Sequence, residues 1–436
     1  MMRTLLRFGL LACVSVVLVS MAFSGCARVM PLGKHDFQVR NNQLRRGDSD
    51  FTLNAIQDPG LGAQGGTLES MVPSMAHIAE VGGNTVCFDL AGFNADGTTL
   101  DAGAVKTVSK IADRGKDQRM APLVRVLGDA TDPAFRKNAV RTAAKALKRE
   151  GRAVYWIDGP NAVELARTFK KIAPRLVVAA PAEADLATIT EAPAEPPEKA
   201  VLLVGKMPDF DKAEVNFVLP PDDKHYAALD QALMRPEEKR PWEPDNSVLS
   251  EEEREAGFIA LFDGKTLDGW WMKDENKEAF HVSEDGFIEW REKGGGALMT
   301  VRRYDDFILR CEWKILPGGN SGIWMRAPRD SRQSKIGMEC QLRGDSGTEE
   351  PEKSNTGAVY DVLPPLAMPA HKEGNWNTLE ARFEGPHYKA WINGVLVQDV
   401  NFDEHEELKY RLRKGFICLT DHGDYVAYRN IRLKEL

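Results

Sequence analysis

A proline-rich and highly charged stretch, residues 221–255, divides this 436-residue chain into two parts with different patterns of apolar residues. The stretch includes the runs RPEEKRPWEPDNS and EEERE. Such a composition is typical of a linker, here one that could include a single helix. Because 436 residues are also too many for one ordinary hydrophobic core, we predict separate domains at 51–220 and 256–436.

The first part, residues 51–220, alternates short apolar runs with longer segments of helical periodicity, such as 133–150. This alternation predicts an α/β domain with a parallel sheet covered by helices. Six strands are visible, fewer than a full eightfold barrel needs, so we expect a barrel-like or partial barrel. The expected strands are Thr85–Leu90, Pro122–Leu127, Ala153–Ile157, Leu176–Ala180, Val201–Val204 and Val215–Leu219.

Polar residues follow three of these strands, where sites of parallel α/β folds are found: Asp89, Arg125 and Asp158. The segment GGNTVCFDLAGFNADG (82–97) weakly resembles the opening strands of barrel-type glycoside hydrolases. The strand that ends in YWIDGPN lacks the Asn-Glu pair that such enzymes often have there. The role of this domain therefore stays open between catalysis, sugar binding and simple spacing.

The amino terminus has the features of an export signal. Arg3 and Arg7 precede an apolar run from Phe8 to Phe23, which is short for a membrane-spanning helix. Ser24-Gly25-Cys26 follows and resembles a bacterial lipobox, which implies that Cys26 is lipidated and begins the mature chain. We expect an exported lipoprotein in the periplasm or at the outer membrane surface, with an ordinary signal peptide or an uncleaved anchor as alternatives. We predict that residues 27–50 form a tether between this anchor and the first domain.

Charge and cysteine content add two expectations. The net charge is −8 and no basic patch stands out, so nucleic acid is not an expected partner. Cys311, Cys340 and Cys418 lie in apolar strand patterns and are predicted to be buried free thiols. A Cys311–Cys340 or Cys340–Cys418 disulfide stays open in an oxidising compartment.

The second part, residues 256–436, has many short strand patterns and seven of the nine tryptophans. Turn signals separate the strands, among them Asp263-Gly264, Asp285-Gly286 and Asn393-Gly394. Many short strands at regular intervals predict an all-β jelly roll or sandwich.

Several motifs follow one another along residues 256–436: GFIALFDGKTLDGW, YDDFILRCEWKILPGGNSGIWMR, GMECQ, GNWNTLEARFEG, WINGVLVQD and DHGDYVAYRNIRLKEL. In order and spacing they resemble the 3-keto-disaccharide hydrolase family. The resemblance implies a concanavalin-like jelly roll whose concave face binds carbohydrate, and cleavage of glycosides already oxidised to a ketone at C3. Two departures concern substrate details: Asp345 comes one place later than the family's usual Asp, and Thr420 replaces a usual Gln.

The chemistry implied by this resemblance requires a base for the C2 proton, a donor for the enolate at O3 and an acid for the leaving oxygen. His422 is the preferred base or acid, because its ordinary pKa is close to neutral. Arg326 is the preferred oxyanion donor, and Glu339 is the alternative base. Since side chains of a strand alternate, Trp324 and Arg326 should share one face, as should Glu339 and Gln341.

Further substrate contacts are expected from Trp324, Gln341, Asp345, Tyr360 and Arg429. His422, Glu339 and Asp345 are also suitable ligands for a divalent metal, although their spacing has no metal signature. Structural roles compete with these assignments, such as a Glu339–Arg326 salt bridge, and Trp270, Trp313 and Trp391 are expected in the core. A non-catalytic carbohydrate-binding surface protein is the alternative function.

Overall fold

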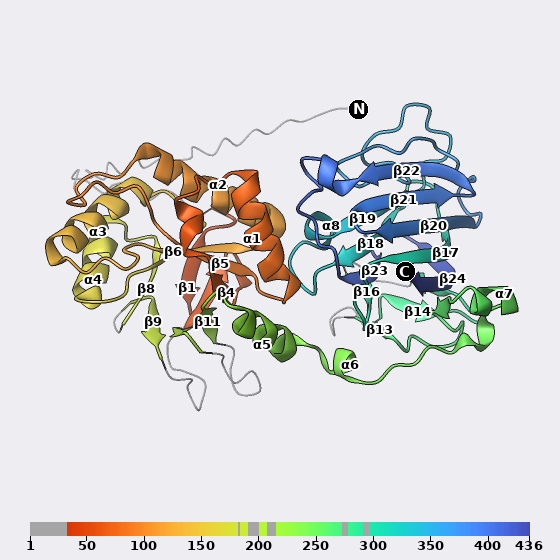
Figure 1. Cartoon of the computed structure of the whole chain (residues 1–436), viewed down its shortest axis with the longest axis horizontal. Coiled ribbons are helices and arrows are strands. Elements are labelled where there is room, and N and C mark those ends of the chain that lie inside the picture. Colours follow the sequence, from red (N-terminus) through yellow and green to blue (C-terminus); the bar gives the residue numbers. More distant parts are fainter. Residues whose placement is uncertain (1–32, 182–183, 191–199, 207–214, 273–277, 291–295) are drawn as a thin grey trace, which may run out of the picture.

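The computed structural model describes residues 33–181, 184–190, 200–206, 215–272, 278–290 and 296–436. An α/β domain and a β-sandwich lie side by side, joined by an extended connection (Figure 1). This confirms the predicted fold classes of the two parts. The predicted export signal, residues 1–26 with Cys26, lies outside the described residues. Within them, we find no helix whose length and apolarity would let it cross a bilayer.

Eight parallel strands close the first domain into a complete barrel, in which the last strand pairs with the first. The strands are β4 (Asn54–Gln57), β5 (Thr85–Asp89), β6 (Ala121–Arg125), β7 (Val154–Trp156), β8 (Val177–Ala180), β9 (Leu186–Ile189), β10 (Val201–Val204) and β11 (Asn216–Leu219). The expectation of fewer than eight strands was wrong. β4 and β9 were missed because their four-residue sequences, NAIQ and LATI, lack a continuous apolar run.

Helices cover the outside of the barrel: η1 (Pro59–Gly62), α1 (Leu68–Glu80), α2 (Ala102–Gln118), α3 (Pro133–Leu147), α4 (Ala162–Ile172) and α5 (Asp223–Leu233). α5 buries Leu229 in the same apolar layer as the other helices. It falls in the predicted linker, so the α/β domain continues beyond residue 220. The connection that remains contains α6 (Pro236–Lys239), η2 (Asn246–Val248) and α7 (Glu251–Glu255).

A small antiparallel sheet closes one end of the barrel: β1 (Phe37–Arg40), β2 (Gln43–Arg46) and β3 (Ser49–Asp50). Phe37 and Leu44 are buried among the residues that fill the barrel interior, such as Leu123. The Phe37 N–H donates to the carbonyl of Gly151, just before β7, at 2.7 Å. The described part of the predicted tether is therefore a plug at the amino-terminal end of the strands. Its polar sequence concealed this role, because among its described residues only Phe37 and Leu44 are buried in the core, with Val39 partly buried against them.

The second domain consists of two antiparallel sheets packed face to face. The larger contains β14 (Phe280–Val282), β15 (Ile288–Trp290), β24 (Val426–Glu435), β17 (Phe307–Ile315), β20 (Asn377–Glu384), β21 (His387–Ile392) and β22 (Val395–Asn401), with β12 (Ile259–Ala260) beside β24. The five-stranded sheet contains β13 (Trp270–Trp271), β16 (Ala297–Thr300), β23 (Phe416–Thr420), β18 (Asn320–Ala327) and β19 (Met338–Arg343). The loops include α8 (Gln333–Ile336) and η4 (Phe402–Glu404).

The sandwich core contains Trp270 and Trp313, as predicted. Trp391 is only half-buried, because its position on β21 faces outward from the larger sheet. All four cysteines that the structure describes, Cys87 and the three of the sandwich, are free and buried. Burial raises the pKa of the Cys340 thiol to about 12. The prediction of buried free thiols is confirmed, and neither proposed disulfide is present.

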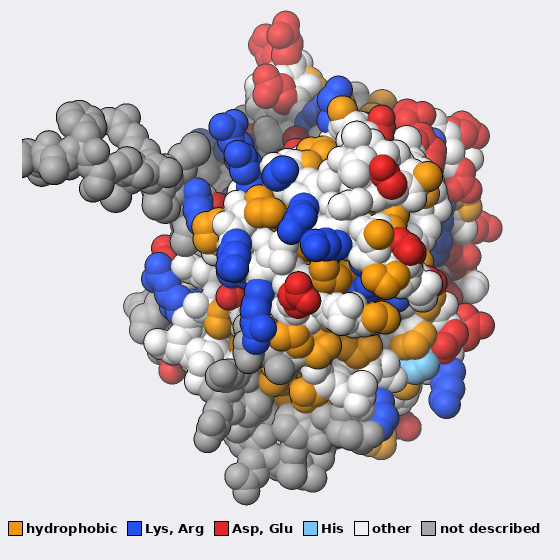
Figure 2. Space-filling view, turned by 90° about the vertical axis from the view of Figure 1, so that its left-hand side faces the viewer, with side chains coloured by type: hydrophobic (Ala, Val, Ile, Leu, Met, Phe, Trp, Pro, Cys, Tyr) orange, Lys and Arg blue, Asp and Glu red, His pale blue; other side chains and the backbone are white. Residues whose placement is uncertain are grey.

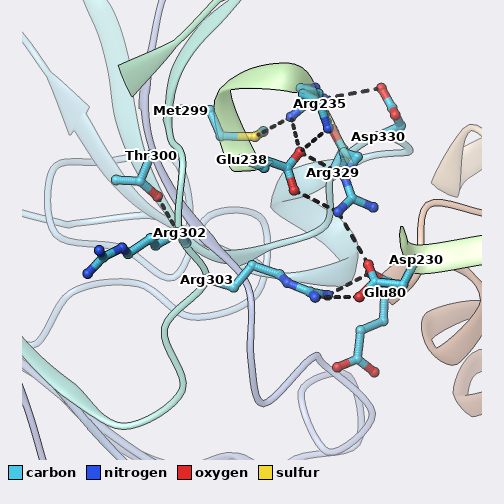
Figure 3. Close-up of polar contacts among 10 residues, drawn as sticks. All are labelled: Glu80, Asp230, Arg235, Glu238, Met299, Thr300, Arg302, Arg303, Arg329 and Asp330. Atoms are coloured by element: carbon cyan, nitrogen blue, oxygen red, sulfur yellow. Dashed lines mark hydrogen bonds and ion pairs between the residues drawn. The ribbon is translucent and has the colours of Figure 1, made fainter. Parts of the chain in front are cut away.

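A buried group of ion pairs joins the two domains (Figure 3). Arg329, from the loop after β18, is 1% exposed and donates to both carboxylate oxygens of Glu238 on α6 at 2.9 and 2.7 Å. It also donates to Asp230 on α5 at 3.2 Å. Arg303 donates to the same Asp230 at 2.6 Å and to the carbonyl of Glu80 at 3.4 Å. The sandwich is therefore fixed to the barrel through charges of which Arg329 and Glu238 are almost fully buried.

Lys and Arg side chains gather on the barrel face that is turned away from the sandwich (Figure 2). Exposed residues of α3 and α4 contribute there: Lys137, Arg141, Lys145, Arg167 and Lys171. The statement that no basic patch stands out was therefore wrong for this face. Helical periodicity directs Val140, Leu147 and three alanines of α3 toward the barrel and leaves Lys137, Arg141 and Lys145 on the surface.

Candidate active site

The outer face of the five-stranded sheet carries several of the predicted site residues. β18 and β19 are antiparallel, with Trp324 opposite Glu339 and Gly322 opposite Gln341. Directly opposed residues of an antiparallel pair point to the same face. Trp324, Glu339 and Gln341 therefore share one face, as their strand positions predict.

His422 meets this group from the turn between β23 and β24. Its Nε2 lies 4.0 Å from Oε1 of Glu339, whose side chain is 4% exposed. Interaction with the Glu339 carboxylate is the main cause that raises the pKa of His422 above its usual value, although burial opposes it. The site thus holds an imidazole next to a desolvated carboxylate, an arrangement suited to proton transfer.

Gly322 makes the position of the Glu339 carboxylate possible. A Cβ at residue 322 would lie 2.2 Å from Oε1 of Glu339, well inside contact distance. On the other side of β18, Trp324 pairs with Cys418, and continuation of this register places Thr420 beside Gly322. The bare backbone of Gly322 is therefore flanked by polar side chains of both neighbouring strands.

Three buried polar atoms of this face have no hydrogen-bond partner within the described part of the chain: Glu339 Oε1, Trp324 Nε1 and Thr420 Oγ1. An unsatisfied buried polar atom typically costs about 1–3 kcal/mol. Gln341, by contrast, donates to Oδ1 of Asn320 at 2.7 Å. The face therefore combines groups that are already ordered with groups that a polar ligand could satisfy.

Tyr360 and Asp345 have different places in the loop beyond β19. Tyr360 donates its backbone N–H to the Glu339 carbonyl at 3.0 Å, and the adjacent Cys340–Val359 bridge puts its side chain on the same face as Glu339. Asp345 accepts from the Asn355 side chain and from the N–H and hydroxyl of Thr356, at 2.7–3.0 Å. Its carboxylate therefore orders the loop, so we no longer assign it to substrate or metal.

Arg326 does not join the site, and the expectation that it points the same way as Trp324 was wrong. A β-bulge between Trp324 and Ala327, with φ of 50° at Arg326, interrupts the alternation of faces. The Arg326 guanidinium is buried over the Phe383 ring at 4.1 Å. It donates to the Asp305 and Gly385 carbonyls and to the Asp306 carboxylate at 2.7–2.9 Å. Arg326 therefore ties the end of the sandwich together and forms no salt bridge with Glu339.

Arg429 also lies elsewhere, on β24 of the larger sheet. Its Nε donates to Glu312 at 2.8 Å, and its guanidinium lies 4.1 Å from the centre of the Trp376 ring. Because Glu312 and Arg429 are cross-strand partners on that sheet, Arg429 cannot form a wall of the site around Gly322.

Comparison with known proteins identifies the sandwich. Residues 257–434 match the model of the 3-keto-alpha-glucoside-1,2-lyase-like domain. The C-terminal half of this chain is a domain of that family. The match confirms the resemblance that the sequence motifs indicated.

A 3-keto-disaccharide hydrolase of Bacteroides thetaiotaomicron is 28% identical to this chain over 229 residues, which are 41% of this chain and 79% of that protein. A crystal structure of a candidate glycosyl hydrolase from Parabacteroides distasonis ATCC 8503 shows 26% identity, covers 43% of this chain and 98% of its own, and has a TM-score of 0.39. A second such structure from the same organism shows 23% identity over 41% of this chain and 99% of its own, with a TM-score of 0.36.

The lyase-like domain also has an apolar patch on its site face that the sequence analysis missed. Trp271, Met299 and Trp324 pack in one cluster there. Arg235, from the interdomain connection, lies 3.5 Å from the centre of the Trp271 ring and contacts the Met299 sulfur at 3.1 Å. Strand alternation in the pair Trp270-Trp271 could have revealed Trp271, since Trp270 faces the core. Nothing in the sequence signalled Arg235, because its contact depends on how the connection folds back.

The predicted metal ligands do not assemble in the lyase-like domain. Among all the residues that the structure describes, no three His, Cys, Asp or Glu side chains form a group that could hold a metal ion. Glu339 and His422 form a pair, and the third proposed ligand, Asp345, is engaged in its loop. The roles of Glu339, His422, Gln341, Trp324 and Tyr360 toward substrate stay predictions.

Proposed function

We propose that the lyase-like domain cleaves glycosides that carry a ketone at C3, by elimination or with net hydrolysis. The observation that carries this proposal is the His422–Glu339 pair on the face of β18, next to donors that lack partners. The family of the domain supplies the class of substrate. No nucleophilic side chain is required, because the ketone itself activates the bond at C1.

The reaction begins with removal of the C2 proton, which the neighbouring ketone acidifies. Neutral His422 accepts that proton, and the C–H electron pair forms an enolate whose negative charge rests on O3. Glu339 stabilises the resulting imidazolium, since a carboxylate beside an imidazole favours its charged form. When the carbonyl at C3 re-forms, a double bond develops between C1 and C2, and the leaving group departs from C1 as its oxygen takes up the proton held by the His422 imidazolium. Addition of water across this double bond then gives net hydrolysis.

The enolate oxygen needs neutral or positive donors nearby. Since Arg326 is buried elsewhere, we assign this role to the indole N–H of Trp324 and the hydroxyl of Thr420, the donors of this face that lack partners in the described structure. Gln341 and Asn320, which are hydrogen-bonded to each other, are placed to bind sugar hydroxyls. The Trp324 ring supplies an apolar surface for the sugar.

The purified protein is expected to consume a 3-keto-glucoside and to leave the unoxidised glucoside intact, because only the ketone acidifies C2. In deuterated water, the recovered 3-keto sugar should carry deuterium at C2, which mass spectrometry detects. Binding of the 3-keto-glucoside without turnover or exchange would instead support a carbohydrate-binding role and contradict the proposed reaction.

The Gly322→Ala variant is expected to lose about 10²-fold in kcat/KM for the 3-keto-glucoside, because its methyl group would displace the Glu339 carboxylate by an ångström or more. The measurement is steady-state kinetics on folded protein. Gly60→Ala, in η1 of the barrel, is the matched control, since its Cβ would meet nothing closer than 3.4 Å. Unchanged kinetics in Gly322→Ala would show that the position of the Glu339 carboxylate does not affect turnover of the 3-keto-glucoside.

We also propose that the chain is an exported lipoprotein with its first mature residue at Cys26. The support is the basic start, the short apolar run and the lipobox-like Ser24-Gly25-Cys26. Bacteria that express the gene and are fed labelled palmitate should incorporate label into the protein, and Cys26→Ser should abolish it. Equal labelling of both forms would contradict lipidation at this residue.

A further inference from the structure

The barrel of the first domain opens onto a pocket at the carboxyl ends of its strands. The pocket volume is about 880 Å³, within the range of small-molecule sites. Its polar lining comes from strands β4, β6, β7 and β9 and the loops after them: Gln57, Arg125, Asp129, Trp156, Asp158 and Thr188. None of the described residues of the sandwich lines it, so this pocket is separate from the site around Gly322.

A single guanidinium organises the charges of the pocket. Arg125 donates from Nε to Asp158 at 2.9 Å and from Nη2 to Asp129 at 2.8 Å, and its Nη1 lies 3.6 Å from Asp89. The same guanidinium lies 5.4 Å from the centre of the Trp156 ring. Together with the neighbouring Arg136, which interacts electrostatically with Asp158, two positive and three negative groups leave a net charge of −1, so the pocket disfavours anionic ligands.

The surrounding chain is built to hold these groups in place. Gly128, with φ of 49°, leaves room for Asp89, because a Cβ there would approach the Asp89 carboxylate to 3.0 Å. Arg136, which is 2% exposed, donates to the carbonyls of Ala130 and Pro160 at 2.6 and 3.2 Å. It thereby ties together the loops that follow β6 and β7. Such support is typical of a preorganised binding site rather than of loops that merely connect elements.

Two polar atoms of the pocket residues lack hydrogen-bond partners in the described structure. They are Nε1 of Trp156, whose side chain is 4% exposed, and Oδ1 of Asp158. One is a donor and the other an acceptor, so a ligand that satisfies both must offer an acceptor and a donor close together. Sugar hydroxyls do both, and the amide of Gln57 and the hydroxyl of Thr188 add groups of the same dual character.

We propose that the mouth of the barrel is a second ligand site, which binds a neutral polyhydroxylated molecule such as a monosaccharide or short glycan. A hydroxyl of the ligand donates to Oδ1 of Asp158, and a ligand oxygen accepts from the indole N–H of Trp156. Gln57 and Thr188 bind further hydroxyls. The net negative charge weakens the binding of sugar acids. This site does not depend on the activity proposed for the sandwich.

Isothermal titration of the full-length protein with glucose, galactose, mannose and maltose, and with glucuronate as the anionic counterpart, tests the proposal. At least one neutral sugar should bind, and glucuronate should bind at least tenfold more weakly than the neutral sugar. The double variant Gln57→Ala/Thr188→Ala should weaken neutral-sugar binding at least tenfold. The matched control Gln231→Ala/Thr168→Ala, on the surfaces of α5 and α4, should bind like the unmodified protein.

Two further variants separate this site from the sandwich and test the charge argument. Trp324→Ala should leave this sugar binding unchanged, whereas turnover of a 3-keto-glucoside should be unchanged in Gln57→Ala/Thr188→Ala. Asp129, whose side chain is 93% exposed, can be replaced by Asn without disturbing packing. Asp129→Asn should reduce the ratio of the dissociation constants for glucuronate and for the neutral sugar. Failure of every neutral sugar to bind, equal binding of glucuronate, or full binding by Gln57→Ala/Thr188→Ala would overturn the proposal.

Discussion

Replacing His422 with glutamine is expected to lower kcat/KM for a 3-keto-glucoside by about 10²–10⁴-fold, the usual contribution of a positioned acid or base. Glutamine keeps a hydrogen-bonding side chain but cannot accept a proton near neutral pH. His422 lies in a turn and its side chain is 40% exposed, so the substitution should leave the thermal unfolding midpoint nearly unchanged. Steady-state kinetics and a melting curve of the same preparation test this expectation. Full activity in folded His422→Gln protein would refute the role of His422 as the base.

The pH dependence of this reaction provides a second readout of the same pair. Glu339 raises the pKa of His422, and only unprotonated His422 accepts a proton, so the rate should fall as the pH drops through that raised pKa. Glu339→Gln removes the main cause of the shift, so the acidic limb should move to lower pH. Asp399→Asn is the control, because Asp399 pairs with His387 at 2.5 Å between β21 and β22 of the larger sheet. An acidic limb that does not move in Glu339→Gln would exclude this coupling.

The stability of the folded protein should also depend on the His422–Glu339 pair. It should decrease as the pH rises, whereas the activity should increase. Since the pKa of His422 is raised in the folded protein, its pairing with Glu339 stabilises the fold fully only below the unfolded pKa of about 6.5. This contribution is lost as the pH rises through the folded pKa. The protein is therefore most active where the pair contributes least to its stability.

Replacing Arg329 with methionine is expected to destabilise the junction of the two domains by about 3–5 kcal/mol, because it removes both hydrogen bonds from the Arg329 guanidinium to the buried Glu238 carboxylate. Glu238 is 4% exposed, so water compensates little for the lost guanidinium there, whereas Asp230 keeps its hydrogen bond from Arg303. The midpoint of urea unfolding should fall, and small-angle scattering should show a larger radius when the domains separate.

The control for this junction is Arg310→Met, which removes an exposed pair with Glu380 and should cost no more than about 1 kcal/mol. Adding Glu238→Gln to Arg329→Met should recover part of the loss, because the buried negative charge is then removed as well. Equal unfolding midpoints for Arg329→Met and Arg310→Met would mean that the junction is not held by these buried charges.

Local sequence patterns were sufficient where the chain follows regular geometry. Period-two alternation placed Glu339 and Gln341 on one face, and the register of β18 and β19 confirms this and adds Trp324 to the same face. Alternation failed at Arg326, because a single bulge with positive φ reverses the direction of the side chain. Such an irregularity is stabilised by distant partners, here Asp306 and Gly385, which no local pattern reveals.

By itself, the sequence determined the two domain types, the family of the sandwich and the buried thiols, because each depends on residues that are close along the chain or on motifs of known order. Only the tertiary structure decided that Glu339 meets His422, which lies 83 residues later in the chain. The same is true of Gly322 on β18, which leaves room for the Glu339 carboxylate. The tertiary structure likewise decided that Phe37 plugs the barrel and that Arg329 joins the domains. These contacts form by packing between elements that are distant in sequence. Their free energy depends on both partners, so no single segment of the chain specifies them.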